Sequence, residues 1–104
     1  MNAQGQPFIR TRAKPIPPKI RAERLVSAAI IRGGVTHDNG SRSHYALRNF
    51  MGDASPMTSP PGDIEGFMTS TGRFVDRREA QLIGEGSGQC RPQGRPLLSS
   101  DINW

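Results

Sequence analysis

The most apolar stretch of the chain is residues 25–31, which reads Leu-Val-Ser-Ala-Ala-Ile-Ile and is closely followed by Gly33 and Gly34. A run this short, rich in β-branched residues and bounded by glycine, is typical of a buried strand. Val35 and Thr36 can continue it as the return strand of a hairpin. We therefore predict a core strand that carries no chemistry of its own.

A second hairpin is predicted in residues 66–75. Phe67, Phe74 and Val75 favour strands. The Ser-Thr-Gly triplet that ends at Gly72 lies between them and is turn material, because glycine takes positive φ values without a steric cost. The two hairpins together supply the strands of a small antiparallel sheet.

A helix is expected directly after this hairpin. Asp76 stands at the N-cap position and Glu79 follows three residues later, which is the spacing of a capping box. This role explains the two carboxylates better than a general acid/base pair does. The helix is expected over residues 78–83, because the glycines that begin with Gly84 are poor helix formers and end it early.

A shorter helix is predicted over roughly residues 44–51, capped by Ser41 or Ser43. At helical spacing its apolar side chains gather on one face, and Arg48 points elsewhere. The predicted inner face consists of Ala46, Leu47, Phe50 and Met51.

The predicted fold class is α+β: a small antiparallel sheet from residues 25–36 and 66–75 with two short helices packed on it and an extended N-terminal arm. Residues 1–24 are expected to form a basic, proline-rich arm, and residues 25–104 a single α+β domain. The C-terminal segment, which ends at Trp104, is expected to pack against this domain or a second subunit.

Charge is unevenly distributed along the 104 residues. Six basic residues and one acidic residue lie between Arg10 and Arg24, which equals the whole net charge of +5. The rest of the chain is neutral. Nucleic-acid binding is therefore predicted only through residues 10–24 and not through the folded body.

Several functional classes are not indicated by the sequence. No apolar run reaches about 18 residues and no apolar leader is seen, so we expect neither membrane insertion nor secretion. Cys90 is the only cysteine, which excludes an internal disulfide and fits the cytoplasm of a host cell. Cys90, His37 and His44 lack metal-ligand spacing, and no catalytic motif is present. We therefore expect no cofactor and no enzymatic activity.

Basic residues lie at both predicted helix starts. Arg73 and Arg77 flank the Asp76 cap, and Arg42 and His44 open the other helix. Cations at a helix N-terminus are unfavourable unless an anion is bound there, so these residues are candidates for phosphate binding. The alternative is that the arginines form ion pairs with Asp76, Glu79 or Glu85.

An aromatic residue beside these cations has two interpretations. Phe74 can offer a surface on which a base stacks, or it can belong to the core.

Five blocks of the sequence resemble a widespread family of small phage and prophage proteins. They are Ala-Ala-Ile-Ile-Arg-Gly-Gly (28–34), Arg-Ser-His (42–44), Gly-Phe-Met-Thr-Ser-Thr-Gly-Arg-Phe-Val-Asp-Arg-Arg-Glu-Ala (66–80), Gly-Gln (88–89) and the ending from Leu98 to Trp104. Through them the chain resembles the phage anti-Thoeris sponge proteins, which bind the immune signal glycocyclic ADP-ribose. The resemblance covers roughly residues 25–104.

The resemblance implies sequestration of a cyclic nucleotide-type signal, either glycocyclic ADP-ribose or a cyclic oligonucleotide, without turnover. It carries the ligand-gripping arginines over to Arg73 and Arg77, assisted by Arg42 and His44. Three departures are visible: Ser43 separates the Arg-His pair, the helix after residue 80 is rich in glycine, and residue 100 is serine where the family has glutamate. The basic arm has no counterpart.

Two alternatives remain open. The chain can act as a protein–protein inhibitor of a host defence nuclease, or it can bind nucleic acid through its arm. A domain of about 80 residues with few aromatic side chains has a thin core, so a homo-oligomer is also expected.

Overall fold

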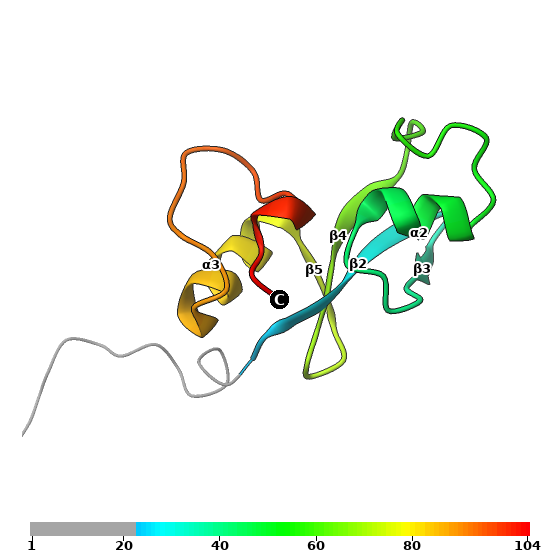
Figure 1. Cartoon of the computed structure of the whole chain (residues 1–104). Helices are drawn as coiled ribbons and strands as arrows, with labels where there is room; N and C mark the ends of the chain where they lie inside the picture. Colours follow the sequence, from blue (N-terminus) through cyan, green and yellow to red (C-terminus); the bar gives the residue numbers. More distant parts are fainter. Residues whose placement is uncertain (1–22) are drawn as a thin grey trace, which may run out of the picture.

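A four-stranded antiparallel sheet organises the fold, with strand order β3-β2-β4-β5. The computed structural model describes residues 23–104, so most of the expected arm and its residues 10–22 lie outside the described part of the chain. The strands are β2 (Leu25–Arg32), β3 (Val35–His37), β4 (Ile64–Thr69) and β5 (Phe74–Asp76) (Figure 1). The predicted α+β class is confirmed.

Both predicted hairpins are present. β2 turns into β3 through Gly33 and Gly34, whose φ values of 58° and 78° fit a two-residue turn of the kind that matches the strand twist. β4 turns into β5 through a loop that contains Gly72, with φ 86°. In both cases the sequence signal is local, which is why the composition of the turn was sufficient to predict it.

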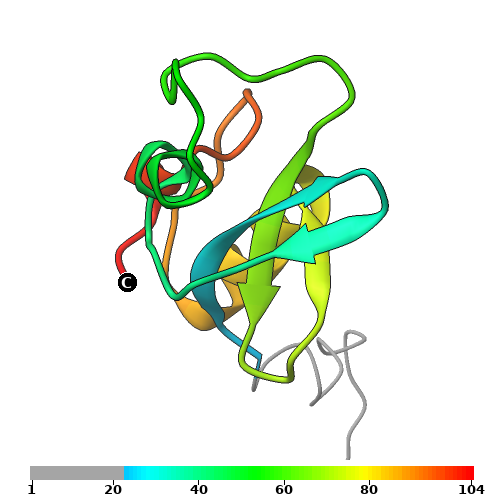
Figure 2. The same ribbon diagram turned by 90° about the vertical axis from the view of Figure 1, so that its right-hand side faces the viewer.

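The two helices are capped as the sequence predicts. α2 (His44–Phe50) begins after Ser43, whose side chain accepts a hydrogen bond from the backbone N–H of Ala46. α3 (Arg77–Ser87) begins after Asp76, whose carboxylate accepts from the backbone N–H of Glu79 at 2.8 Å. In Figure 2, α3 lies behind the sheet.

The core lies between the sheet and α3. Phe67 of β4 and Val75 of β5 pair across the strands, and both pack with Ala80 and Ile83 of α3. Leu25 closes the core at the start of β2, where the side-chain amide of Gln89 bonds to both its backbone N–H and its C=O at 2.8 Å. Gln89 thus extends the hydrogen-bonding of β2 at its start, where β3 does not reach.

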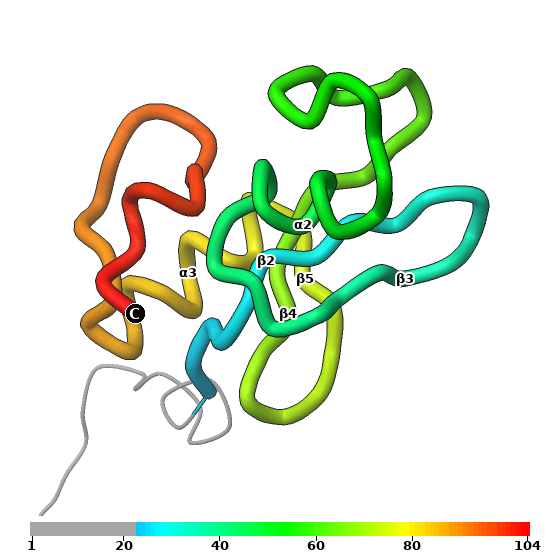
Figure 3. Tube along the Cα trace, turned by 45° about the vertical axis from the view of Figure 1, so that its right-hand side comes forward, coloured from blue at the N-terminus to red at the C-terminus, as the bar shows by residue number. Residues whose placement is uncertain are grey.

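The C-terminal segment returns to the core, as expected. Leu97 is fully buried and Ile102 nearly so, on either side of the short 3-10 helix η1 (Ser99–Asp101). The ring of Trp104 lies 6.2 Å from that of Phe67 between centroids. Figure 3 shows this segment running back alongside α3. None of the helices in residues 23–104 has the length and apolar character that a membrane span needs.

The predicted early end of α3 is wrong. The helix continues through Gly84 and ends only at Gly88, which has the left-handed φ of 79°. A Cβ on Gly84 would lie 2.6 Å from the Sγ atom of Cys90. The glycine is therefore present so that the following loop can pack against the helix, and its low helix propensity is outweighed by this packing.

The predicted inner face of α2 is only partly right, because Leu47 is the one of its four residues that is buried. His44, Leu47 and Arg48 are buried, whereas Ala46 is exposed and 71% of Phe50 is accessible to solvent. The buried residues follow the i, i+3, i+4 spacing of one helix face, but two of them are polar. Burial of these two is possible because each has a polar partner on β4.

Candidate functional site

A groove of about 910 Å³ lies between α3 and residues 93–97. The Asp76 cap places residues 77 and 78 in the first turn of α3, and residues 81 and 82 lie one turn further along the same side. The wall on α3 therefore consists of Arg77, Arg78, Gln81 and Leu82, and Glu65 and Asp76 complete the lining.

The opposite wall is held in place by Asp101. Its carboxylate accepts hydrogen bonds from Arg95 at 2.7 and 2.8 Å, from Gln93 at 3.1 Å and from the backbone N–H of Leu98 at 2.8 Å. The bonds from Arg95, above all, hold the pKa of Asp101 well below its usual range. The wall thus has a hydrogen-bond network of its own around Asp101.

Cationic side chains predominate in the groove. Arg77, Arg78 and Arg95 face it together with two carboxylates, those of Glu65 and Asp76. Arg78 is exposed, and within residues 23–104 no hydrogen bond or ion pair involves its guanidinium. It is therefore available to bind an anion from solvent.

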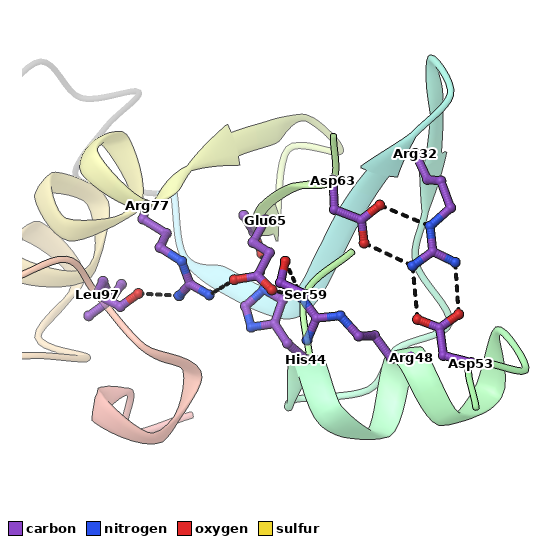
Figure 4. Close-up of polar contacts among 10 residues, drawn as sticks. Arg32, His44, Arg48, Asp53, Ser59, Asp63, Glu65, Arg77 and Leu97 are labelled. Carbon is purple, nitrogen blue, oxygen red and sulfur yellow. Dashed lines mark hydrogen bonds and ion pairs between the residues drawn. The ribbon is translucent and has the colours of Figure 1, made fainter. Parts of the chain in front are cut away.

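Arg77 is held more firmly. Its guanidinium donates to the backbone C=O of Leu97 and to the carboxylate of Glu65 (Figure 4). It also lies 5.9 Å from the centroid of the Phe67 ring. Only about a fifth of its side chain is exposed, and this burial lowers its pKa. Arg77 therefore joins the groove to the core.

Behind the groove, Glu65 also forms an ion pair with Arg48 of α2. Arg48 is 4% exposed and donates in addition to the hydroxyl of Ser59 at 3.2 Å. The neighbouring carboxylates of Asp53 and Asp63 form ion pairs with a different arginine, Arg32, as Figure 4 shows. Burial lowers the pKa of Arg48, and the nearby charges of Asp63 and Asp53 oppose this effect.

The sequence-predicted residue His44 is part of the core and not of the groove lining. Its Nε2 donates to the backbone C=O of Gly66 at 2.8 Å, and its ring meets that of Phe67 edge-on. Burial lowers its pKa to about 4, and the nearby charges of Arg77 and Arg48 add to the effect. Within residues 23–104, no three His, Cys, Asp or Glu side chains come together as metal ligands.

Arg73 lies outside the groove lining. It donates to the buried carboxylate of Glu23 at 2.8 and 2.9 Å and to Glu79 at 2.6 Å. These bonds raise the pKa of Arg73, and the bond to Arg73 contributes most to lowering that of Glu23 to about 2. The ion pair with Glu79 is one of those that the sequence left open as an alternative.

The last two predicted residues also lie apart from the groove. The guanidinium of Arg42 is stacked over the ring of Trp104 at 5.7 Å. Phe74 is half-buried and alternates with the core residue Val75, so it faces the other side of the sheet. Its ring covers Gly66, where a Cβ would lie 2.5 Å from the ring. Among the five predicted residues, within the described chain, the groove lining includes Arg77 alone.

Sequence reasoning missed the other groove residues. Gln81 could have been found from its helical spacing relative to Arg77 and Arg78, and Arg78 from its place beside Arg77 in the first turn of the helix. Arg48 and Glu65 could not, because their contact joins α2 to β4 through tertiary structure alone.

Comparison with known families identifies a family for most of the chain. A family model described as "Phage T4 y16D protein" matches residues 19–103. No curated protein and no solved structure matches the chain.

Proposed function

Because the chain belongs to the phage T4 y16D protein family, we propose that it is a phage-encoded anti-defence protein of the host cytoplasm that sequesters a small anionic ligand in the groove beside α3. The ligand that we propose is a cyclic nucleotide-type immune signal, either glycocyclic ADP-ribose or a cyclic oligonucleotide, bound without turnover. This ligand class is supported by the resemblance of the 66–80 block to the sponge proteins.

The observation that carries the proposal is the concave, arginine-lined groove. Its volume of about 910 Å³ lies within the range of small-molecule sites. Arg78 supplies a guanidinium with no partner in residues 23–104, and guanidinium binds phosphate oxygens in a bidentate manner. Arg77 adds a second cation that is partly desolvated, which strengthens its attraction for an anion.

Other lining residues suit the remainder of a nucleotide. The side chains of Gln81 and Gln93 carry amides that can bond to ribose hydroxyls or base edges. Leu82 is 61% exposed beside them and offers an apolar surface for a base. The groove thus combines phosphate, polar and apolar contacts in one place, as nucleotide sites do.

Sequestration needs affinity and no chemical step. A ligand at a hundredfold excess over its Kd stabilises the fold by about 2.7 kcal/mol, so binding should be visible as a thermal shift. The proposal is tested by calorimetry and thermal denaturation with glycocyclic ADP-ribose, cyclic ADP-ribose and cyclic oligonucleotides. If none of them gives heat or raises the melting temperature, the proposal is refuted.

Two variants locate the site. Arg78→Ala should weaken binding by about tenfold or more, since it removes a charge-assisted contact without breaking any hydrogen bond or ion pair within residues 23–104. Arg91→Ala is the matched control, because Arg91 is equally exposed but lies outside the groove lining. Mass spectrometry of the released ligand distinguishes sequestration, which returns it intact, from an enzymatic activity, which returns it cleaved.

The alternatives predict different outcomes. Nucleic-acid binding through residues 10–24 would weaken steeply with salt, would be lost in a variant without residues 1–22, and would be unaffected by Arg78→Ala. Inhibition of a host nuclease would require a stable complex with that protein, which size-exclusion chromatography detects. The same measurement on the isolated chain tests whether it forms a homo-oligomer.

A further inference from the structure

Two arginines converge on one carboxylate at the wall of the groove. Glu65 presents one oxygen to Arg48 and the other to Arg77 (Figure 4). The three residues come from α2, β4 and α3, so the cluster joins three separate elements of the fold. Glu65 and Arg77 are each about a fifth exposed and both line the groove, which gives a ligand access to them.

The hydrogen-bonding capacity of Arg48 is not met. Its side chain is 5% exposed, and its Nε has no hydrogen-bond partner within residues 23–104. A buried N–H without an acceptor is costly and is uncommon in folded proteins. The cluster can therefore accept further oxygen atoms.

The charges of the cluster are also unequal. Arg32 occupies the carboxylates of Asp53 and Asp63 in bidentate pairs at 2.8 to 2.9 Å. Glu65 is then the only carboxylate, among the described residues, in contact with both Arg48 and Arg77. Two positive charges face a single negative one in a partly buried place.

We propose that Arg48 and Arg77 form an oxyanion clamp, which Glu65 fills in the free protein, and that the phosphate group of a ligand takes its place. The diphosphate bridge of an ADP-ribose carries about two negative charges and four non-bridging oxygens, so it matches two guanidinium groups better than one carboxylate does. The inference rests on the proposed function and deepens it, because it assigns Arg77 of the groove lining, with Arg48 behind Glu65, as the residues that grip the phosphate.

Charge balance indicates that the phosphate of the ligand replaces the carboxylate of Glu65 and does not simply bind beside it. In the free protein Arg48 and Arg77 carry two positive charges, and Glu65 carries the single negative charge that contacts both. An added dianion would leave the cluster with excess negative charge unless Glu65 withdrew. Because Glu65 borders the groove, its carboxylate can move toward solvent as the ligand enters. The carboxylate thereby competes with every incoming anion and excludes weak ones.

The experiment is to neutralise the competing carboxylate. Glu65→Gln should lower the melting temperature of the free protein and should bind pyrophosphate on the order of tenfold more tightly than the unchanged chain does. Binding is measured by calorimetry and by the pyrophosphate concentration that restores the melting temperature, at constant ionic strength. A gain in affinity is expected because the arginines lose their internal partner.

Asp63→Asn is the matched control. It also removes a carboxylate that pairs with an arginine, but Asp63 is outside the groove lining. Pyrophosphate should rescue Glu65→Gln and not Asp63→Asn. If pyrophosphate raised the melting temperature of both variants equally, the effect would be a general salt effect and the clamp would be refuted. The clamp would also be refuted if Glu65→Gln bound pyrophosphate no more tightly than the unchanged chain.

A second variant covers the case in which Glu65→Gln does not fold. Glu65→Asp keeps the charge but shortens the side chain, so it should bind pyrophosphate more tightly than the unchanged chain; no gain refutes the clamp. If a cyclic nucleotide binds but neither variant gains affinity, the clamp fails and the proposed function stands. If pyrophosphate binds tightly to a variant but no cyclic nucleotide binds to any form, the clamp stands and the proposed ligand fails.

Discussion

Acidification should destabilise the fold through His44. This ring is 6% exposed, and its pKa is lowered from 6.5 to about 4 by burial, with a contribution from the nearby guanidinium groups of Arg77 and Arg48. Because the folded-state pKa is the lower of the two, the contribution of His44 to stability is complete above pH 6.5. It is lost as the pH falls from 6.5 toward 4, where the unfolded chain binds a proton that the folded chain rejects.

The size of the effect follows from the two pKa values. A pKa difference of about 2.5 corresponds to about 2 kcal/mol of lost stability at pH 5 and about 3 kcal/mol at pH 4. For a domain of this size, 2 kcal/mol lowers the melting temperature by about 10 °C. The carboxylate of Glu23, whose pKa is about 2, contributes only below its ordinary value of 4.5. The interval from about pH 6.5 to 5 therefore isolates the histidine.

The measurement is urea denaturation as a function of pH, followed by the fluorescence of Trp104, which packs near the core residue Phe67. His44→Gln should be less stable at neutral pH but should show a nearly flat profile between pH 6.5 and 5. His37→Gln is the control and should keep the slope of the unchanged chain. A slope that survives in His44→Gln would refute the assignment.

Three further changes test the packing. Gln89→Leu should cost roughly 2–3 kcal/mol in urea denaturation, because it leaves two backbone groups of β2 without partners. Gly84→Ala should destabilise the fold by about 1–3 kcal/mol, although alanine favours helices, because its Cβ would clash with the Sγ atom of Cys90. Much of this cost should disappear in a Cys90→Ala background. Additive effects of the two changes in a double-mutant cycle would contradict the clash. Arg73→Ala should lower the free energy of unfolding by roughly 2–3 kcal/mol, because it leaves the buried carboxylate of Glu23 without its cation. Calorimetry should find ligand binding unchanged in this variant. A loss of binding without a loss of stability would mean that Arg73 belongs to the binding site.

The hairpins and caps could be predicted because their causes are local. Gly33 and Gly34 fix a turn by their own φ values, and Asp76 caps α3 through a bond to a residue three positions away. The end of α3 could not be predicted in this way. It depends on the approach of Cys90 to Gly84, which appears only when the loop has folded back.

The candidate site was predictable only in part. The position of Arg77 at a helix start was visible in the sequence, and it does line the groove. The partners of Arg73 were weighed only among neighbouring carboxylates, whereas its buried partner is Glu23, 50 residues away. Arg48 was assigned to the outside of α2 because it is charged, but the carboxylate of Glu65 compensates for its burial. Such pairs depend on tertiary contacts that no periodicity reveals.

The burial of Glu23 decides where this chain can be cut. Its carboxylate has no exposed surface and accepts bonds from Thr69, Thr71 and Arg73, all in or near the turn between β4 and β5. Composition alone suggests a shortened protein that starts at residue 25, and that protein would lack the carboxylate. One that starts at Glu23 keeps it. Only the longer protein tests the role of the basic segment. A defect of the shorter one would not distinguish the loss of the arm from destabilisation of the turn between β4 and β5.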